Sequence, residues 1–133
     1  MSLLDTNVIS ELRKTKPHGG VLAWLNATPE SGLFISAVTL GEIQRGIELT
    51  KDQNLEKASE ISQWADRLAA THNILPMDAQ TFRVWAQLMH HQSEALFEDA
   101  MIAATAQVHQ LTVVTRNTRD FAGFQVPLLD PFQ

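Results

Sequence analysis

Four acidic side chains stand where short apolar runs end or where helices are expected to begin. Asp5 ends the run SLLD, Glu42 lies in the segment TLGE, Asp99 opens DAMIAATA, and Asp120 follows LTVVT. Clustered carboxylates repel one another unless a cation neutralises them. A set of oxygen ligands with neither Cys nor His nearby suits Mg²⁺ or Mn²⁺. Such an ion polarises a phosphoryl oxygen and activates water, so the pattern favours hydrolysis of a phosphodiester.

Each of these acids also has a structural explanation. Asp5 would cap a helix that begins near Thr6, and the segment 39–42 matches a capping box in which the glutamate reaches back to the first amide. Asp99 would be favoured by a helix dipole, and Asp120 fits a turn. Taken together these explanations weaken, because Asp5 and Asp99 are embedded in apolar sequence, where an unpaired carboxylate costs several kcal/mol.

Short apolar runs and amphipathic segments alternate along the chain, and they predict the strands and helices that would position the acids. Strands are expected at 2–5, 33–39, 73–77, 111–115 and 126–129. Helices are expected at 7–14, at 21–27, from 39 onward, and at 54–71, 79–91 and 99–109, with a break at 17–20 (PHGG). The pattern predicts an α/β fold with a parallel sheet of four or five strands and helices on both faces. Ligands bind such sheets outside the carboxyl ends of the strands, where the four acids would converge.

Composition narrows the class of protein. The chain has 133 residues, of which 44% are hydrophobic and 19% charged, so residues 1–133 are expected to form one globular domain. Cysteine is absent, which excludes disulfides, thiolate zinc sites and a cysteine nucleophile. No apolar run approaches the ~20 residues of a membrane helix, so a cytoplasmic protein without membrane contact is expected. The net charge of −5 means that any nucleic acid must bind through a local basic patch or a bound cation.

Basic side chains are few, and most lie near the expected rim of the site. Six of the ten basic residues are expected there, namely Arg13, Lys14, Lys16, Arg45, Arg116 and Arg119. They would guide a phosphate backbone or form an ordinary solvated surface, and both interpretations stay open. Arg45 and Arg116 are the first to test. The tryptophans are expected in the core or an interface, with base stacking by one of them as an alternative.

Four segments carry a resemblance to a known family. They are LLDTNVISEL, ISAVTLGEIQRGI, EDAMIAATAQVHQLTVVTRNTRDF and VPLLDP, and together they span essentially the whole chain. In this ordered set the sequence resembles the PIN-domain ribonucleases, specifically the VapC toxins of bacterial toxin–antitoxin pairs and their FitB-like relatives. The resemblance implies a Rossmann-like, three-layer α/β/α PIN domain with metal-dependent endoribonuclease activity.

The resemblance also implies roles for single residues. Asp5 and Asp99 match the main ligands of Mg²⁺ or Mn²⁺, and Glu42 matches a third acid that contacts the metal directly or through water. Asp120 matches the fourth acidic position. Many relatives instead carry an acid where this chain has Asn117, so which of the two completes the site stays open.

Further residues are expected to support the site. Thr6 and Asn7 fit hydroxyl and amide roles beside Asp5, although helix capping explains them equally well. Thr115, at the end of an expected strand, would help to position phosphate or solvent. Arg45 and Arg116 complete the predicted set.

The resemblance implies partners as well. Relatives form homodimers and bind a cognate VapB-type antitoxin, whose C-terminal segment crosses the toxin's groove and often inserts an arginine near the acids. Their substrate is RNA, commonly structured RNA such as tRNA. Operator DNA is contacted only through the antitoxin, and assembly into a higher hetero-oligomer stays open.

Other classes of protein fit less well. A phosphatase of the haloacid dehalogenase type needs a second acid two residues after the first, where this chain has Asn7. A response-regulator receiver needs adjacent acids near its first strand. The remaining alternative is a catalytically inactive PIN-fold module that acts only by binding a partner. Retention of all four acids argues against it, since a dead site has no reason to keep carboxylates that repel one another.

Overall fold

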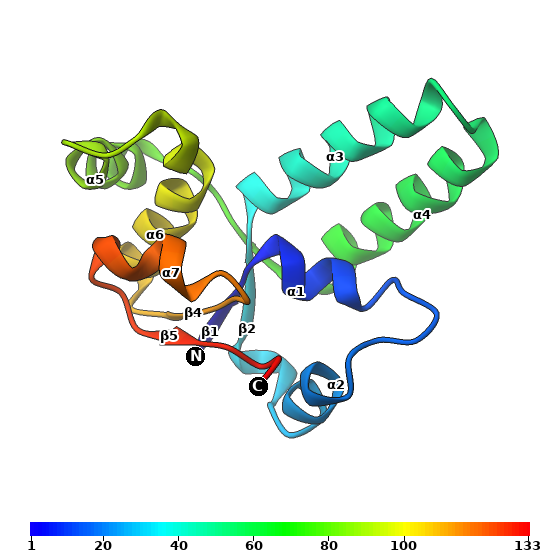
Figure 1. Cartoon of the computed structure of the whole chain (residues 1–133), viewed down its shortest axis with the longest axis horizontal. Helices are drawn as coiled ribbons and strands as arrows, with labels where there is room; N and C mark the ends of the chain where they lie inside the picture. The colour runs from blue at the N-terminus through cyan, green and yellow to red at the C-terminus, as the bar shows by residue number, and fades with distance from the viewer.

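The computed structural model describes residues 1–133 and contains one parallel sheet of five strands (Figure 1). The strands are β1 (Ser2–Leu4), β2 (Leu33–Ser36), β3 (Asn73–Leu75), β4 (Thr112–Val114) and β5 (Leu128–Leu129), in the order β3-β2-β1-β4-β5. All four strand pairs are parallel. The predicted parallel sheet is therefore confirmed, with five strands.

Seven α-helices connect and cover the strands. They are α1 (Thr6–Glu11), α2 (Gly19–Asn26), α3 (Ala37–Lys51), α4 (Leu55–Thr71), α5 (Ala79–Met89), α6 (Phe97–His109) and α7 (Thr118–Phe121). Short 3₁₀ turns lie at Glu30–Gly32, Glu94–Leu96 and Ala122–Phe124. Figure 1 shows α3 and α4 as an antiparallel pair on one side of the molecule, with α5, α6 and α7 on the other. None of the helices combines the length and the apolar character that crossing a membrane requires.

Successive side chains of the strands point to opposite faces of the sheet, and helices cover both faces, which gives the three predicted layers. Leu4 and Val114 belong to an apolar cluster with residues of α1, α2, α3 and α4. Their neighbours Leu3 and Val113 belong to a second cluster with α6 and α7. Successive side chains of a strand point to opposite faces, so a strand covered on both faces must be apolar throughout. Helix α6 is buried along most of its length, as its apolar sequence predicts.

The order of the strands creates a crevice between β1 and β4. From β1 the chain moves outward through β2 to β3, then returns to the other side of β1 to form β4 and β5. In open α/β sheets ligands bind at this switch point, outside the carboxyl ends of the strands. Asp5 follows β1 and donates its N–H to the Val114 carbonyl at 2.9 Å, and Thr115 follows β4. Both residues therefore stand at the switch point.

The boundary between β2 and α3 differs from the expectation. The strand ends at Ser36 rather than at residue 39, because the Ser36 hydroxyl accepts the Val38 N–H at 3.1 Å and caps a helix that starts at Ala37. The predicted capping box at 39–42 is therefore wrong. Thr39 is buried inside the helix, and Glu42 lies in its second turn rather than its first.

The first two helices also have different bounds. Helix α1 ends at Glu11 instead of residue 14, and α2 already begins at Gly19, inside the expected break. The His18 Nδ1 atom accepts the Gly20 N–H at 3.0 Å and caps α2. Between the helices, the buried Glu11 carboxylate accepts the His18 N–H at 2.8 Å and pairs with Lys14 at 2.8 Å. This carboxylate ties the loop back onto α1.

Candidate active site

A pocket of about 270 Å³ opens at the switch point, and no hydrophobic residue lines it. Its lining comes from the end of β1, from α1, α3 and α6, and from the loop after β4. The lining residues are Asp5, Thr6, Asn7, Ser10, Glu42, Asp99 and Asn117. Three acids that are far apart in the sequence thus meet in one cavity, as the order of the strands predicts.

Asp5 is the most buried of the acids, with 5% of its surface exposed. Its Oδ1 accepts the Thr6 N–H at 2.8 Å, while its Oδ2 accepts the Thr115 hydroxyl at 2.7 Å and the Asn7 amide at 3.2 Å. Burial raises the pKa of Asp5, the bonds from Thr115 and Thr6 oppose this, and the negative charge of Asp120 adds to it. Asp5 therefore caps α1, as expected, and also presents a fixed carboxylate to the pocket.

Asn7 and Thr115 join the two strand ends around this carboxylate. The Asn7 amide donates to the Thr115 hydroxyl at 3.3 Å, and its Oδ1 accepts the Arg116 N–H at 3.2 Å. The Asn117 N–H donates to the Thr115 hydroxyl at 3.0 Å. The chain after β4 is thus fixed to the chain after β1, which places Asn117 beside Asp5 in the lining.

Glu42 faces the pocket from α3. Its Oε1 accepts the Thr6 hydroxyl at 3.0 Å, and that hydroxyl also lies 3.1 Å from the hydroxyl of Thr39. Burial raises the pKa of Glu42 to about 7, and the negative charges of Glu98 and Asp5 contribute, while the bond from Thr6 opposes the shift. A carboxyl group with this pKa exchanges its proton near neutral pH.

Asp99 reaches the pocket from the first turn of α6. Burial raises its pKa to about 6, and the negative charges of Asp5, Asp120 and Glu98 add to the shift. Each of the four predicted acids therefore lies within electrostatic reach of at least one other. Unpaired like charges at this density are tolerated when they share protons or a cation.

The fit to a metal ion rests on the chemistry of the donors. The lining offers carboxylate, amide and hydroxyl oxygens and no sulfur or imidazole, which is the donor set that Mg²⁺ and Mn²⁺ prefer. No three acidic or histidine side chains lie close enough in this arrangement to share one ion. A Mg²⁺ site needs only one or two carboxylates, so the pocket fits the ion.

Comparison with known proteins decides the family. The family model described as "PIN domain" matches residues 2–125. The chain belongs to the PIN-domain family. This PIN domain is 34% identical to Toxin FitB of Neisseria gonorrhoeae over 139 residues, covering 99% of each chain. It is 33% identical to VapC ribonuclease Y4jK of Sinorhizobium fredii, covering 100% of this chain and 99% of that protein. The predicted resemblance to VapC and FitB-like proteins is confirmed.

Solved structures show the same similarity. The PIN domain matches the structure of FitAB bound to the IR36 DNA fragment with a TM-score of 0.85 and 34% identity, covering 100% of this chain and 96% of that chain. It matches a toxin–antitoxin complex from Klebsiella pneumoniae with a TM-score of 0.76 and 27% identity, covering 100% and 99% of the two chains. The predicted three-layer fold is that of these relatives.

The other predicted residues of the PIN domain lie at varying distances from the pocket. Asp120 is exposed on α7 and does not line the cavity, although its negative charge contributes to the raised pKa of Asp5 and of Asp99. Thr115 lies buried directly behind Asp5. Arg45 is exposed on α3 and lines no cavity. The Arg116 guanidinium lies over the Phe132 ring, 4.6 Å from its centroid, and so faces the C-terminal segment.

The sequence reasoning missed one residue that lines the pocket and one charged residue that acts on it from outside the lining. Ser10 lines the pocket one helical turn after Thr6, and this spacing of four residues would have placed both on one face of α1. Glu98 directly precedes Asp99, and its charge raises the pKa of both Glu42 and Asp99. The two adjacent acids at the start of α6 are the sequence signal that would have indicated a role for Glu98.

Proposed function

We propose that this PIN domain is the toxin of a toxin–antitoxin pair and acts as a divalent-metal-dependent endoribonuclease. The observation that carries the proposal is the convergence of Asp5, Glu42 and Asp99 from three separate elements on one pocket without apolar lining. Relatives named VapC ribonuclease and Toxin FitB support the same activity and role.

Asp5 and Asp99 would hold Mg²⁺ or Mn²⁺, with Glu42 as the third acid. The ion, when bound, supplies a Lewis acid that polarises the phosphoryl oxygen and lowers the pKa of water. Three donors fix the Asp5 carboxylate in one orientation, which spares it reorganisation during the reaction. Either Asn117, which lines the pocket, or Asp120, whose charge reaches it, completes the site.

Glu42 is the candidate for proton transfer. Its Oε1 accepts the Thr6 hydroxyl, and its carboxyl group faces the pocket from α3, where it could take a proton from an attacking water. Asn117 can orient a ligand through its amide but cannot act as a base. The division of labour would therefore be metal binding by Asp5 and Asp99 and proton transfer by Glu42.

The proposed partners follow from the relatives. Solved relatives include FitAB bound to DNA and a toxin–antitoxin complex. We therefore propose that a VapB-type antitoxin binds this chain and inhibits it, that operator DNA is contacted through the antitoxin, and that the toxin forms a homodimer. The substrate would be RNA.

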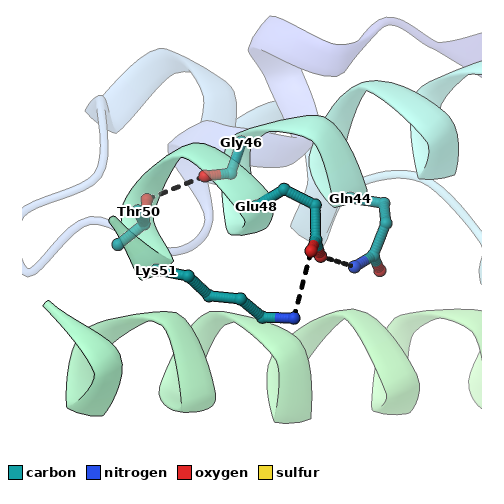
Figure 2. Close-up of polar contacts among 5 residues, drawn as sticks. All are labelled: Gln44, Gly46, Glu48, Thr50 and Lys51. Atoms are coloured by element: carbon teal, nitrogen blue, oxygen red, sulfur yellow. Dashed lines mark hydrogen bonds and ion pairs between the residues drawn. The ribbon is translucent and has the colours of Figure 1, made fainter. Parts of the chain in front are cut away.

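Cleavage of total RNA by the purified full chain tests the activity. Cleavage is expected with Mg²⁺ or Mn²⁺ and is lost after EDTA treatment, in Asp5→Asn and in Asp99→Asn. The matched control is Glu48→Gln, because Glu48 lies on α3 like Glu42 but is exposed and bonds to Gln44 and Lys51 (Figure 2). Glu48 does not line the pocket. Equal cleavage by EDTA-treated protein would contradict the metal mechanism.

An inactive binding module is the alternative function. It predicts that no divalent ion supports cleavage, while the wild-type chain still binds the antitoxin. The toxin role predicts growth arrest on expression of the wild-type chain, relief by the co-expressed antitoxin, and no arrest by Asp5→Asn. Normal growth with the folded wild-type chain would count against the toxin role.

A further inference from the structure

A second cavity, of about 230 Å³, adjoins the acidic pocket. The two cavities share Thr6, Ser10 and Glu42 in their linings. Away from the acids the second cavity becomes apolar, with Ile43, Ile61 and Trp64 among its walls between α1, α3 and α4. We call it the Trp64 pocket.

A basic depression continues from the Trp64 pocket. Arg13 lines both, and Lys14 and Lys57 line the depression together with Ser10 and Thr15. Lys14 pairs with Glu11, which leaves Arg13 and Lys57 as the bases of the depression outside that ion pair. The Arg13 guanidinium lies 5.9 Å from the centroid of the Trp64 ring, within the range of a cation–π contact. Ser10 lines all three cavities. The surface thus passes from acidic through apolar to basic over a continuous track.

The acidic, apolar and basic surfaces follow one another in the order of a phosphodiester, its adjoining base and the next phosphate of a single RNA strand. We propose, on the basis of the proposed ribonuclease function, that the Trp64 pocket receives one unpaired nucleobase flanking the cleaved phosphodiester, and that Arg13 and Lys57 attract the next phosphate. The pocket is smaller than the ~300 Å³ at which sites for drug-sized ligands begin, which limits its occupant to a small group such as a single heterocycle. An aromatic wall beside a basic groove is the usual means of binding single strands, because every base has a face that stacks.

Gly46 keeps the Trp64 pocket open. It lines the pocket in the interior of α3, where glycine is the least favourable residue other than proline. A Cβ atom built at Gly46 meets no atom within 4 Å, so a side chain there has room to extend into the pocket. The Gly46 carbonyl accepts the Thr50 hydroxyl at 2.8 Å, one helical turn on (Figure 2). A larger residue at position 46 would therefore obstruct the pocket without disturbing the backbone.

The test compares Gly46→Leu with Gly41→Leu. Gly41 is the other glycine of α3, has equally open space at its Cβ, and lines none of the cavities. Both variants improve helix propensity, so neither is expected to melt below the wild type. The substrate is a short single-stranded RNA whose cleavage site is mapped, together with matched RNAs that carry one abasic ribose next to that site. The readout is kcat/KM.

Wild type and Gly41→Leu are expected to lose about tenfold in kcat/KM when the flanking base is removed. Gly46→Leu is expected to cleave the intact RNA about tenfold more slowly and to show no further loss with the abasic RNA. Full cleavage and an undiminished abasic effect in Gly46→Leu would overturn the pocket assignment while leaving the ribonuclease function intact. If Gly46→Leu cleaves normally but escapes inhibition by the antitoxin, the pocket seats protein and the inference is wrong. If the wild type cleaves no RNA, the proposed ribonuclease function itself is wrong, and the pocket assignment that depends on it is wrong as well.

Discussion

The Thr115 hydroxyl donates a 2.7 Å hydrogen bond to Oδ2 of Asp5, between residues that follow β4 and β1. Both side chains are buried, and the two positions are 110 residues apart in the chain. The bond lies at the switch point of the sheet, where it fixes the carboxylate that we propose as a metal ligand. It thus joins the topology of the sheet to the chemistry of the pocket.

Replacing Thr115 by valine tests this relationship. Thr115→Val keeps the shape but removes the donor, and hydrogen bonds to charged groups contribute about 1.5–3 kcal/mol. We expect a lower free energy of unfolding by urea denaturation and a decrease in RNA cleavage of about tenfold or more, because Asp5 loses its fixed orientation. Thr115→Ser should retain most of both. Cleavage by Thr115→Val at the wild-type rate would show that this bond does not position the site.

The raised pKa values predict a pH-dependent stability of the metal-free protein. The pKa of Glu42 is about 7 against an ordinary 4.5, and that of Asp99 is about 6 against 3.8. The folded chain therefore binds protons more tightly than the unfolded chain, so this contribution is full below about pH 4 and is lost as the pH rises through 6 to 7. Thermal melts in EDTA should show a falling Tm across this window.

The same thermal melts, repeated on variants of the two acids, distinguish their contribution to the pH dependence of Tm from that of the other residues. Glu42→Gln and Asp99→Asn should each flatten the fall between about pH 5 and pH 7.5, because the neutral side chain carries no charge to repel. Added Mg²⁺ should raise the Tm more at pH 8 than at pH 5, since it binds the ionised carboxylates. A Tm that rises through this window in EDTA would contradict the account of the acids.

Glu42 and Glu48 offer a comparison within one helix. Glu42→Gln removes a carboxylate from the pocket, so we expect kcat to fall at least tenfold and its dependence on pH to change. Glu48→Gln removes a carboxylate bonded to Gln44 and Lys51 at the surface and should leave kcat unchanged (Figure 2). The measurement is a pH–rate profile of RNA cleavage for both variants. Parallel profiles with equal loss would argue that net charge alone matters.

Ser36 tests the revised start of α3. Its hydroxyl accepts the Val38 N–H, so Ser36→Ala should lower the free energy of unfolding by about 1 kcal/mol, as for other lost N-caps. Urea denaturation provides the measurement. The predicted capping box instead required the helix to begin at Thr39. Unchanged stability of Ser36→Ala would remove the evidence for a cap at Ser36.

The sequence predicted the architecture well because its signals are local. Continuous apolar strands separated by helices indicate a parallel sheet, and a parallel sheet brings acids at strand ends together. Boundaries were less predictable where two signals competed. Residues 37–39 are apolar and β-branched in part, which favoured a strand, but the cap at Ser36 makes them helical. At 19–20, capping by His18 outweighs the turn preference of two glycines.

The site was predicted less completely because side-chain contacts depend on packing across elements. The four acids could be named from the sequence, but the bonds from Thr6 to Glu42 and from Thr115 to Asp5 join positions 36 and 110 residues apart. Arg13 and Trp64 share a pocket because α4 folds back against α3, which in turn contacts α1. Arg45 and Arg116, which the sequence placed at the rim of the site, line no cavity, whereas Arg13 lines two.

Binding of Mn²⁺ tests the central claim, that separate stretches of chain form one metal pocket. Electron paramagnetic resonance counts the free ion in titrations of the full chain at pH 7.5. The account predicts saturable binding by the wild type and by Glu48→Gln, and a loss of affinity of tenfold or more in both Asp5→Asn and Asp99→Asn. Folded Asp5→Asn and Asp99→Asn variants that bind Mn²⁺ as tightly as the wild type would contradict it.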